Sequence, residues 1–145
     1  MSYLQENAMP KTVLITGASR GVGAASAKLF AKHGFDIVLN CSSTKADAEK
    51  IAEECKKNGI RTLVIERDIS DENNCKSIIE DTVNCFGGID VLVNNAARTK
   101  FAFNHADMDA LNTDDFLAIY STNVVAPDRK STRLNSSHQI ISYAV

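Results

Sequence analysis

The sequence has no tryptophan, only two prolines, and no apolar run approaching the roughly 18 residues that span a bilayer. Its first ten residues lack the charged-then-apolar layout of a secretory signal peptide. Sixteen Lys and Arg residues oppose eighteen Asp and Glu residues, so the formal net charge of the 145 residues is only −2. These absences argue against a membrane or a nucleic acid as the main partner. We expect a globular cytoplasmic protein.

The sequence also lacks a recognisable metal site. Its four cysteines include no C-x-x-C pair, and its three histidines are scattered with no second ligand at helical spacing. We therefore predict no bound metal. We interpret the cysteines as free thiols in a reducing compartment.

Apolar, strand-like runs alternate four times with helix-like segments. The strands are expected at 12–16, 37–39, 62–65 and 89–93, and the helices at 24–33, 45–58 and 70–86, with a last helix capped by Thr113. The strands are continuous apolar runs, which is typical of parallel strands buried on both faces. This alternation predicts an α/β fold with a doubly wound parallel sheet of the Rossmann type.

The turn after the first predicted strand carries a glycine pattern. In Thr-Gly-Ala-Ser-Arg-Gly-Val-Gly, Gly17 allows a tight turn, Gly21 a close approach of the backbone to a ligand, and Gly23 close packing of helix on sheet. The N–H groups and positive dipole end of the following helix suit a diphosphate. Three glycines can equally make an ordinary strand-to-helix turn, so this motif alone leaves both interpretations open.

The residues after the second predicted strand bear on which dinucleotide binds. An acid there would hold the ribose hydroxyl of NAD, but Ser42 and Ser43 follow the strand instead. Arg20 in the glycine turn, together with these serines and Lys45, can bind a 2′-phosphate through charge-assisted hydrogen bonds. The pattern favours NADP over NAD, with a solvated loop cation as the alternative role of Arg20.

The third and fourth predicted strands also end in polar residues. Asp68 and Ile69 follow the third strand, and Asn94, Asn95, Ala96 and Ala97 end the fourth. The carboxyl ends of parallel strands are where open α/β sheets bind ligands. Asp68 can instead cap the next helix, and the asparagines can be an ordinary start of a loop.

In this order, the T-G-x-x-x-G-x-G turn, the Asp-Ile pair and the N-N-A-A stretch resemble the short-chain dehydrogenase/reductase family, especially 3-oxoacyl-carrier-protein reductases. The resemblance covers about residues 11–127, and Ala97 stands where the family usually has Gly. It implies NAD(P)-dependent hydride transfer between nicotinamide and a small-molecule carbonyl or alcohol substrate. It also implies a homodimer or homotetramer.

The resemblance and the motifs together assign roles to individual residues. Asn123 matches the helix asparagine of the family's catalytic tetrad, which orders a proton-relay water; an ordinary polar residue late in a helix is the alternative. The predicted cofactor-binding residues are Gly17, Ala18, Ser19, Arg20, Gly21, Val22, Gly23, Ser42, Ser43, Asp68, Ile69, Asn95, Ala96 and Ala97. The family's chemistry also needs a Ser and a Tyr-x-x-x-Lys pair, and the 145 residues contain no Tyr-x-x-x-Lys.

The composition changes after Pro127. Residues 128–145 have no usable apolar period, and they match the translation of a common sequencing-library adapter in which residues 139–140 fill the variable index. We therefore expect an N-terminal arm at 1–10, the N-terminal half of a dinucleotide-binding domain at 11–127, and a non-native tail at 128–145. Such a fold keeps about four of roughly six strands, and its fourth strand is expected to be an unpaired edge.

These observations predict that the parent protein is an NAD(P)-dependent oxidoreductase and that this chain is an inactive, truncated cofactor-binding fragment. A non-catalytic NAD(P)-binding sensor is the alternative, because nothing before Pro127 excludes it. A methyltransferase is a weaker third hypothesis, since that class of enzyme wants an acid after the second strand.

Overall fold

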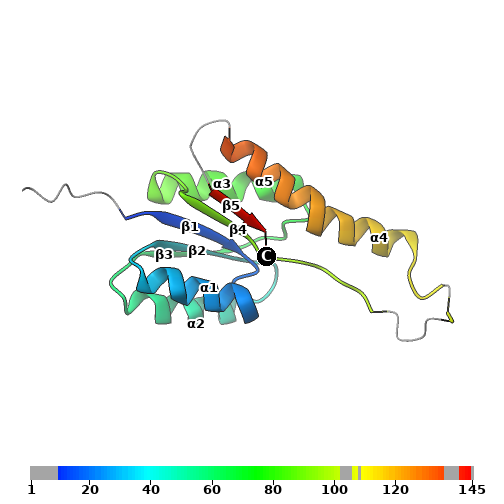
Figure 1. The fold of residues 1–145 in the computed structure, drawn as a ribbon, viewed down its shortest axis with the longest axis horizontal. Helices are drawn as coiled ribbons and strands as arrows, with labels where there is room; N and C mark the ends of the chain where they lie inside the picture. The colour runs from blue at the N-terminus through cyan, green and yellow to red at the C-terminus, as the bar shows by residue number, and fades with distance from the viewer. Residues whose placement is uncertain (1–9, 102–105, 108, 136–140, 145) are drawn as a thin grey trace, which may run out of the picture.

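The computed structural model describes residues 10–101, 106–107, 109–135 and 141–144, and its centre is a parallel sheet in the order β3-β2-β1-β4-β5 (Figure 1). The strands are β1 (Thr12–Thr16), β2 (Asp36–Cys41), β3 (Thr62–Glu66), β4 (Val91–Asn94) and β5 (Ile141–Ala144). The helices are α1 (Gly21–Lys32), α2 (Lys45–Lys56), α3 (Glu72–Phe86), α4 (Thr113–Tyr120), the π-helical turn η1 (Ser121–Val125) and α5 (Ala126–Asn135). The predicted α/β fold is confirmed, while the predicted arm at 1–10 lies outside the described residues except for Pro10.

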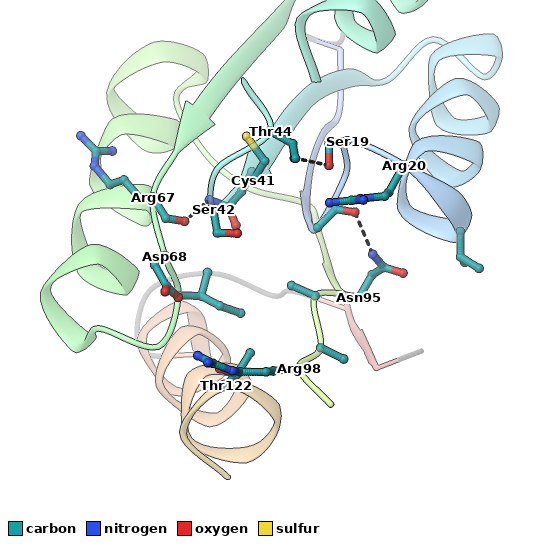
Figure 2. A pocket seen from close by; sticks show the side chains of 16 residues that line it. Ser19, Arg20, Cys41, Ser42, Thr44, Arg67, Asp68, Asn95, Arg98 and Thr122 are labelled. Carbon is teal, nitrogen blue, oxygen red and sulfur yellow. Dashed lines mark hydrogen bonds between the residues drawn. The ribbon is translucent and has the colours of Figure 1, made fainter. Parts of the chain in front are cut away.

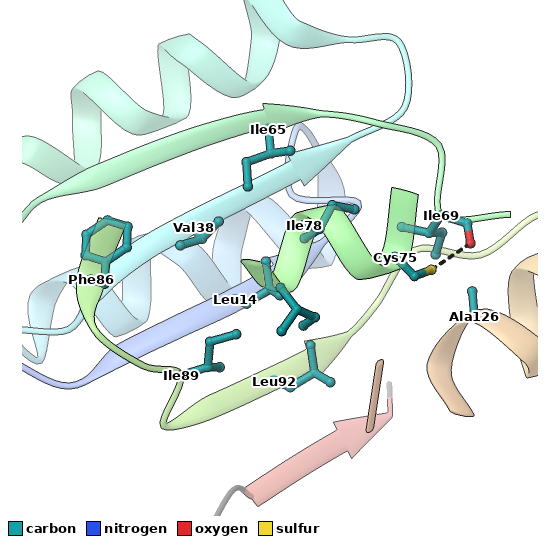
Figure 3. Packing of buried hydrophobic residues seen from close by; sticks show 11 residues of the cluster. Leu14, Val38, Ile65, Ile69, Cys75, Ile78, Phe86, Ile89, Leu92 and Ala126 are labelled. Atoms are coloured by element: carbon teal, nitrogen blue, oxygen red, sulfur yellow. Dashed lines mark hydrogen bonds between the residues drawn. The ribbon is translucent and has the colours of Figure 1, made fainter. Parts of the chain in front are cut away.

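Helices cover both faces of the sheet, α1 and α2 on one face and α3 and α5 on the other (Figure 1). Val13 and Ile15 of β1 enter the core under α1 and α2, whereas Leu14 enters the opposite core, where Figure 3 shows it near Ile78 of α3. Side chains alternate between the faces of a strand, so a strand buried on both sides must be apolar throughout. In the part of the chain that the structure describes, no helix has the length and apolarity to cross a membrane.

Two helices begin at residues other than the predicted ones because a neighbouring side chain provides the cap. The α3 helix begins after Asp71, whose carboxylate accepts two backbone N–H groups, and not at Ser70. The α4 helix is capped by Asn112 in a capping box, so Thr113 is its first helical residue. The amino end of α1 lies at Gly21, three residues before the predicted start, so the helix begins inside the glycine motif.

The edge of the sheet also differs from the prediction. The fourth strand is not an unpaired edge and the sheet does not stop at four strands, because β5 pairs in parallel with β4, with Val91 opposite Ile141 and Asn94 opposite Ala144. The physical reason is that the open side of β4 presents N–H and C=O groups that an extended segment can satisfy. The α4, η1 and α5 segments provide the crossover that a parallel pair requires.

One side chain in the core beneath α5 is poorly matched to its surroundings. Lys130 is fully buried, and its ammonium group has no hydrogen-bond partner among the described residues. Burial lowers the pKa of Lys130 to about 8, since a charge is costly to remove from water. An apolar side chain would suit this position on the helix better than a lysine.

Candidate functional site

A cleft of about 560 Å³ lies at the carboxyl ends of the first four strands (Figure 2). Here the sheet order changes direction, because β2 lies on one side of β1 and β4 on the other, and open α/β sheets bind ligands at such a point. The residues that line the cleft are Gly17, Ser19, Arg20, Val22, Asn40, Cys41, Ser42, Thr44, Arg67, Asp68, Ile69, Asn95, Ala96, Ala97, Arg98 and Thr122. Residues predicted from four separate places in the sequence therefore meet at one cavity.

Ten of the fourteen predicted cofactor-binding residues line the cleft, and the other four, Ala18, Gly21, Gly23 and Ser43, do not. Ala18 is buried beneath the first turn, where its N–H donates to the Asn40 carbonyl at 3.0 Å. Ser43 is exposed beyond Ser42. Ser42 is therefore the serine that faces a ligand in the cleft.

The glycine turn is shaped by close backbone contacts. Gly17 has φ of 65°, and a Cβ there would lie 2.9 Å from the Cα of Ala96. A Cβ on Gly23 would collide with the carbonyl oxygen of Gly17. Gly21 has φ of 56° and open space beside it, so its backbone is accessible at the start of α1. The turn is thus tight beneath and open above, which is the form that a bound diphosphate requires.

Asn95 fastens the end of β4 to this turn. Its side-chain Nδ2 donates to the carbonyl oxygens of Thr16 at 2.9 Å and Gly17 at 3.1 Å, and the dashed line at the labelled Asn95 in Figure 2 marks the bond to Gly17. The Thr16 hydroxyl accepts the N–H groups of Asn95 at 3.2 Å and Ala96 at 3.1 Å. The Asn95 side chain therefore shapes the cleft, and its partner Thr16 was not among the predicted site residues.

Two further lining residues, which were not among those predicted, hold the adjacent wall of the cleft. Asn40 donates through Nδ2 to the carbonyl oxygens of Ile65 at 3.1 Å and Arg67 at 3.0 Å, which ties β2 to the end of β3. The Thr44 hydroxyl donates to Ser19 Oγ at 2.6 Å and so links the loop before α2 to the glycine turn. Sequence could have suggested Asn40, since a polar residue ending a buried strand needs a partner.

The charges that face the cleft are mostly positive. The lining residues include three arginines and one acid, Asp68, whose carboxylate accepts the N–H of Ser70 at 2.9 Å. The Arg67 guanidinium pairs with Asp81 and points away from the cleft (Figure 2). Arg20 and Arg98 remain on the walls of the cavity. Burial raises the pKa of the Cys41 thiol, so this lining residue stays uncharged at neutral pH.

Asn123, the predicted catalytic residue, lies in η1 and is not part of the cleft lining. Its Oδ1 accepts the N–H of Arg98 at 2.8 Å, and its Nδ2 donates to the Arg98 carbonyl at 3.0 Å. The amide thus positions the chain that leaves β4. Its neighbour Thr122 is buried and lines the cavity.

Within the described part of the chain, no group of three or more His, Cys, Asp or Glu side chains is arranged to hold a metal ion. The cleft also contains no tyrosine or lysine among its lining residues. What the arrangement offers is a tight glycine turn with an accessible backbone at Gly21, a polar wall and two cations.

The sequence is similar to known oxidoreductases. A family model described as short chain dehydrogenase matches residues 11–133. The 3-oxoacyl-acyl-carrier-protein reductase FabG of Staphylococcus aureus is 39% identical over 92 residues, which cover 63% of this chain and 37% of that protein. The uncharacterised oxidoreductase YhdF of Bacillus subtilis is 37% identical over 116 residues, 79% of this chain and 38% of that protein. The chain thus spans less than half the length of these two relatives.

Solved structures agree with this similarity. The acetoin dehydrogenase YohF from Salmonella typhimurium superposes with a TM-score of 0.77 at 30% identity, over 88% of this chain and 49% of that one. A short-chain dehydrogenase from Burkholderia cenocepacia in complex with NADP superposes with a TM-score of 0.81 at 30% identity, over 90% of this chain and 52% of that one. The family resemblance drawn from the three motifs is confirmed.

Proposed function

Because this chain belongs to the short-chain dehydrogenase family, we propose that its cleft binds a nicotinamide dinucleotide and prefers NADP to NAD. The observation that carries the proposal is the glycine turn, where contacts at Gly17 and Gly23 exclude a Cβ. The preference rests on the side chains at the rim, where Arg20 and Ser42 line the cleft and no acid follows β2. A guanidinium and a hydroxyl suit a 2′-phosphate, whereas a carboxylate would repel it.

Each wall of the cleft would hold a different part of the dinucleotide. The turn from Gly17 to Gly23 and the amino end of α1 would bind the pyrophosphate through backbone N–H groups. Asp68 and Ile69 would lie at the adenine. The backbone of Asn95, Ala96 and Ala97 would lead toward the nicotinamide ribose, held in place by the hydrogen bonds of Asn95 to the first turn.

We propose that the whole protein transfers a hydride between the nicotinamide and a carbonyl or alcohol carbon of a small molecule. The bound dinucleotide supplies the redox chemistry. The residues of this chain bind it, orient it and exclude water from one side of it. Asn123 would fix the Arg98 backbone at the far wall of the cavity and, as the resemblance implies, order a water for proton transfer.

The proposal is tested by comparing binding with turnover. The purified 145-residue chain is expected to bind NADPH but to give no carbonyl-dependent NADPH oxidation, because its sequence has no Tyr-x-x-x-Lys. Turnover by this chain at the level of a full-length relative would contradict the inactive-fragment hypothesis. If the parent gene lacks Tyr-x-x-x-Lys after the codon for Pro127, the sensor hypothesis replaces the reductase.

We propose further that residues 128–145 are not native to this domain. Their match to a translated adapter supports this, and so does Lys130, an unpartnered lysine in a position suited to an apolar side chain. Sequencing the parent gene across the codon for Pro127 tests the proposal directly. An uninterrupted genomic reading frame through the final codons would contradict it.

The cysteines bear on the compartment in which the protein works. Three of the four free cysteines are buried and one, Cys85, is exposed, which supports a reducing compartment such as the cytoplasm.

An exposed apolar face runs along α4 and η1 and consists of Phe116, Leu117, Tyr120 and Val124. We propose that a second copy of the protein covers this face in a homodimer or homotetramer, since large exposed apolar patches mark interaction sites.

A further inference from the structure

Arg98 is a feature of the cleft to which the motifs assign no role. It follows Ala97 at the end of β4, its residue is exposed, and it lines the cavity together with Asp68, Ile69 and Thr122. Figure 2 shows its side chain extending from the β4 wall toward Thr122, on the side of the cavity where Asp68 lies. Arg20 approaches from the opposite wall, so the two cations serve different parts of a bound ligand.

The position of Arg98 is fixed through its backbone. Asn123 accepts its N–H at 2.8 Å and donates to its carbonyl at 3.0 Å. Both bonds involve only main-chain atoms of Arg98, so they leave its guanidinium unused. A substitution of the side chain therefore keeps this anchor intact.

Nearby acids do not neutralise the Arg98 guanidinium. Among the described residues, no hydrogen bond or ion pair of that group is found, and its interaction with Asp115 is only a longer-range electrostatic one. The Asp115 carboxylate pairs with Lys100 at 2.6 Å and accepts the Asn112 N–H at 3.0 Å. A planar cation thus remains in the lining of the cleft that also contains the buried Ile69 side chain, and this lining carries little negative charge.

We propose that Arg98 stacks its guanidinium on the adenine ring of the bound dinucleotide and so determines affinity for the adenosine half. The inference rests on the proposed function. Ile69 would cover one face of the ring and the guanidinium the other, an arrangement that suits a flat, electron-rich base. Arg20 would act on the 2′-phosphate instead, which separates affinity for adenosine from selectivity for NADP.

The test measures dissociation constants of the 145-residue chain for four probes, of which NADH lacks only the 2′-phosphate. NADPH contains all groups, 2′,5′-ADP lacks the pyrophosphate and nicotinamide, and NMNH lacks the adenosine. The variants are Arg98→Ala, Arg98→Lys and, as a matched cation on the opposite wall, Arg20→Ala. Circular dichroism and urea unfolding confirm that each variant keeps the fold.

Arg98→Ala is expected to weaken the binding of NADPH and of 2′,5′-ADP by the same factor, between about threefold and about thirtyfold. This is the range expected for a cation on an aromatic face. NMNH binding is expected to stay unchanged. Arg98→Lys is expected to behave like Arg98→Ala, because an ammonium cannot stack as a plane. Arg20→Ala is expected to weaken the binding of both 2′-phosphorylated probes, NADPH and 2′,5′-ADP, but to leave the affinity for NADH unchanged.

Four results would overturn the proposal. If Arg98→Ala weakens NADPH but not 2′,5′-ADP, the guanidinium contacts another part of the dinucleotide. If Arg98→Lys binds like the unmodified chain, charge and not stacking is responsible. If the unmodified chain binds none of the probes, the proposed cofactor site is refuted together with the role of Arg98. If Arg20→Ala weakens binding as expected but Arg98→Ala does not, only the role of Arg98 is refuted.

Discussion

Neighbouring serines after β2 differ in what they can reach. Ser42 lines the cleft, while Ser43 lies outside its lining and is exposed. From the sequence, both serines were predicted to bind a 2′-phosphate, because they are adjacent and equally polar. Only the path of the backbone after Cys41 separates them.

Replacing Ser42 by Asp is expected to reverse the preference between NADP and NAD. A carboxylate a few ångströms from a 2′-phosphate costs about 1–4 kcal/mol, so NADPH affinity falls by at least about fivefold while NADH affinity holds or improves. Calorimetric titration with both nucleotides measures the change. Ser43→Asp is the matched control. An equal loss of NADPH affinity in both variants would mean that the added negative charge acts at long range and that Ser42 makes no direct contact with the 2′-phosphate.

Residue patterns predicted the members of the site better than their roles. The glycines and Asn95 were identified from motifs, because the types of residue that fit a diphosphate turn are few. The double hydrogen bond of Asn95 to Thr16 and Gly17 was not predictable, since it joins residues 79 and 78 positions apart in the chain. Thr44, Asn40 and Arg98 were missed for the same reason: their partners lie on other elements.

Whole elements were predicted where the periodicity of apolar residues is strong. The β1 strand has the predicted bounds, whereas α3 and α4 begin at caps one or two residues from the predicted starts. The α5 helix could not be predicted, because its sequence has no apolar stripe. It packs against α3, and the consequence is a buried Lys130.

Lys130→Met is expected to stabilise the fold, most strongly at neutral pH. The pKa of Lys130 is about 8 in the folded chain and near 10.5 when exposed, so the unfolded chain binds more protons between these pH values. The stability of the unmodified chain should therefore rise from pH 8 to pH 10.5, by up to about 3 kcal/mol. Below pH 8 the whole cost of burying the charge persists.

Urea unfolding at pH 7 and pH 10 measures this effect as the difference between the variant and the unmodified chain. The difference should be large at pH 7 and small at pH 10. Lys76→Met, which changes a half-exposed lysine on α3, provides the control for removing a charge. A difference that does not depend on pH would mean that Lys130 is not buried as a charge.

At the scale of the whole molecule, the predicted doubly wound parallel sheet is present, with β2 and β4 on either side of β1, whereas the fifth strand was not predicted. An open edge on β4 is a place where any extended segment can pair, whatever its sequence. The apolar face on α4 and η1, in contrast, remains exposed. We expect that face to govern assembly.

Replacing Leu117 by Glu is expected to shift the protein from dimer or tetramer to monomer. The side chain is 61% exposed, so the substitution should leave the fold intact while placing a charge in the proposed contact. Sedimentation equilibrium measures the assembly. Leu29→Glu on α1, at 59% exposure, is the control, and an unmodified chain that is already monomeric would refute this interface.

The most direct test of the central claim is to map where NADPH binds, by amide chemical shifts of the isotope-labelled 145-residue chain during titration. We expect shifts concentrated in the glycine turn from Gly17 to Gly23, at Asp68 and Ile69, and from Asn95 to Arg98. The edge of β3 around Leu63 and the exposed end of α3 near Cys85 should not respond. Shifts confined to those outer regions, or no saturable shift at all, would contradict the claim that this cleft is a dinucleotide site.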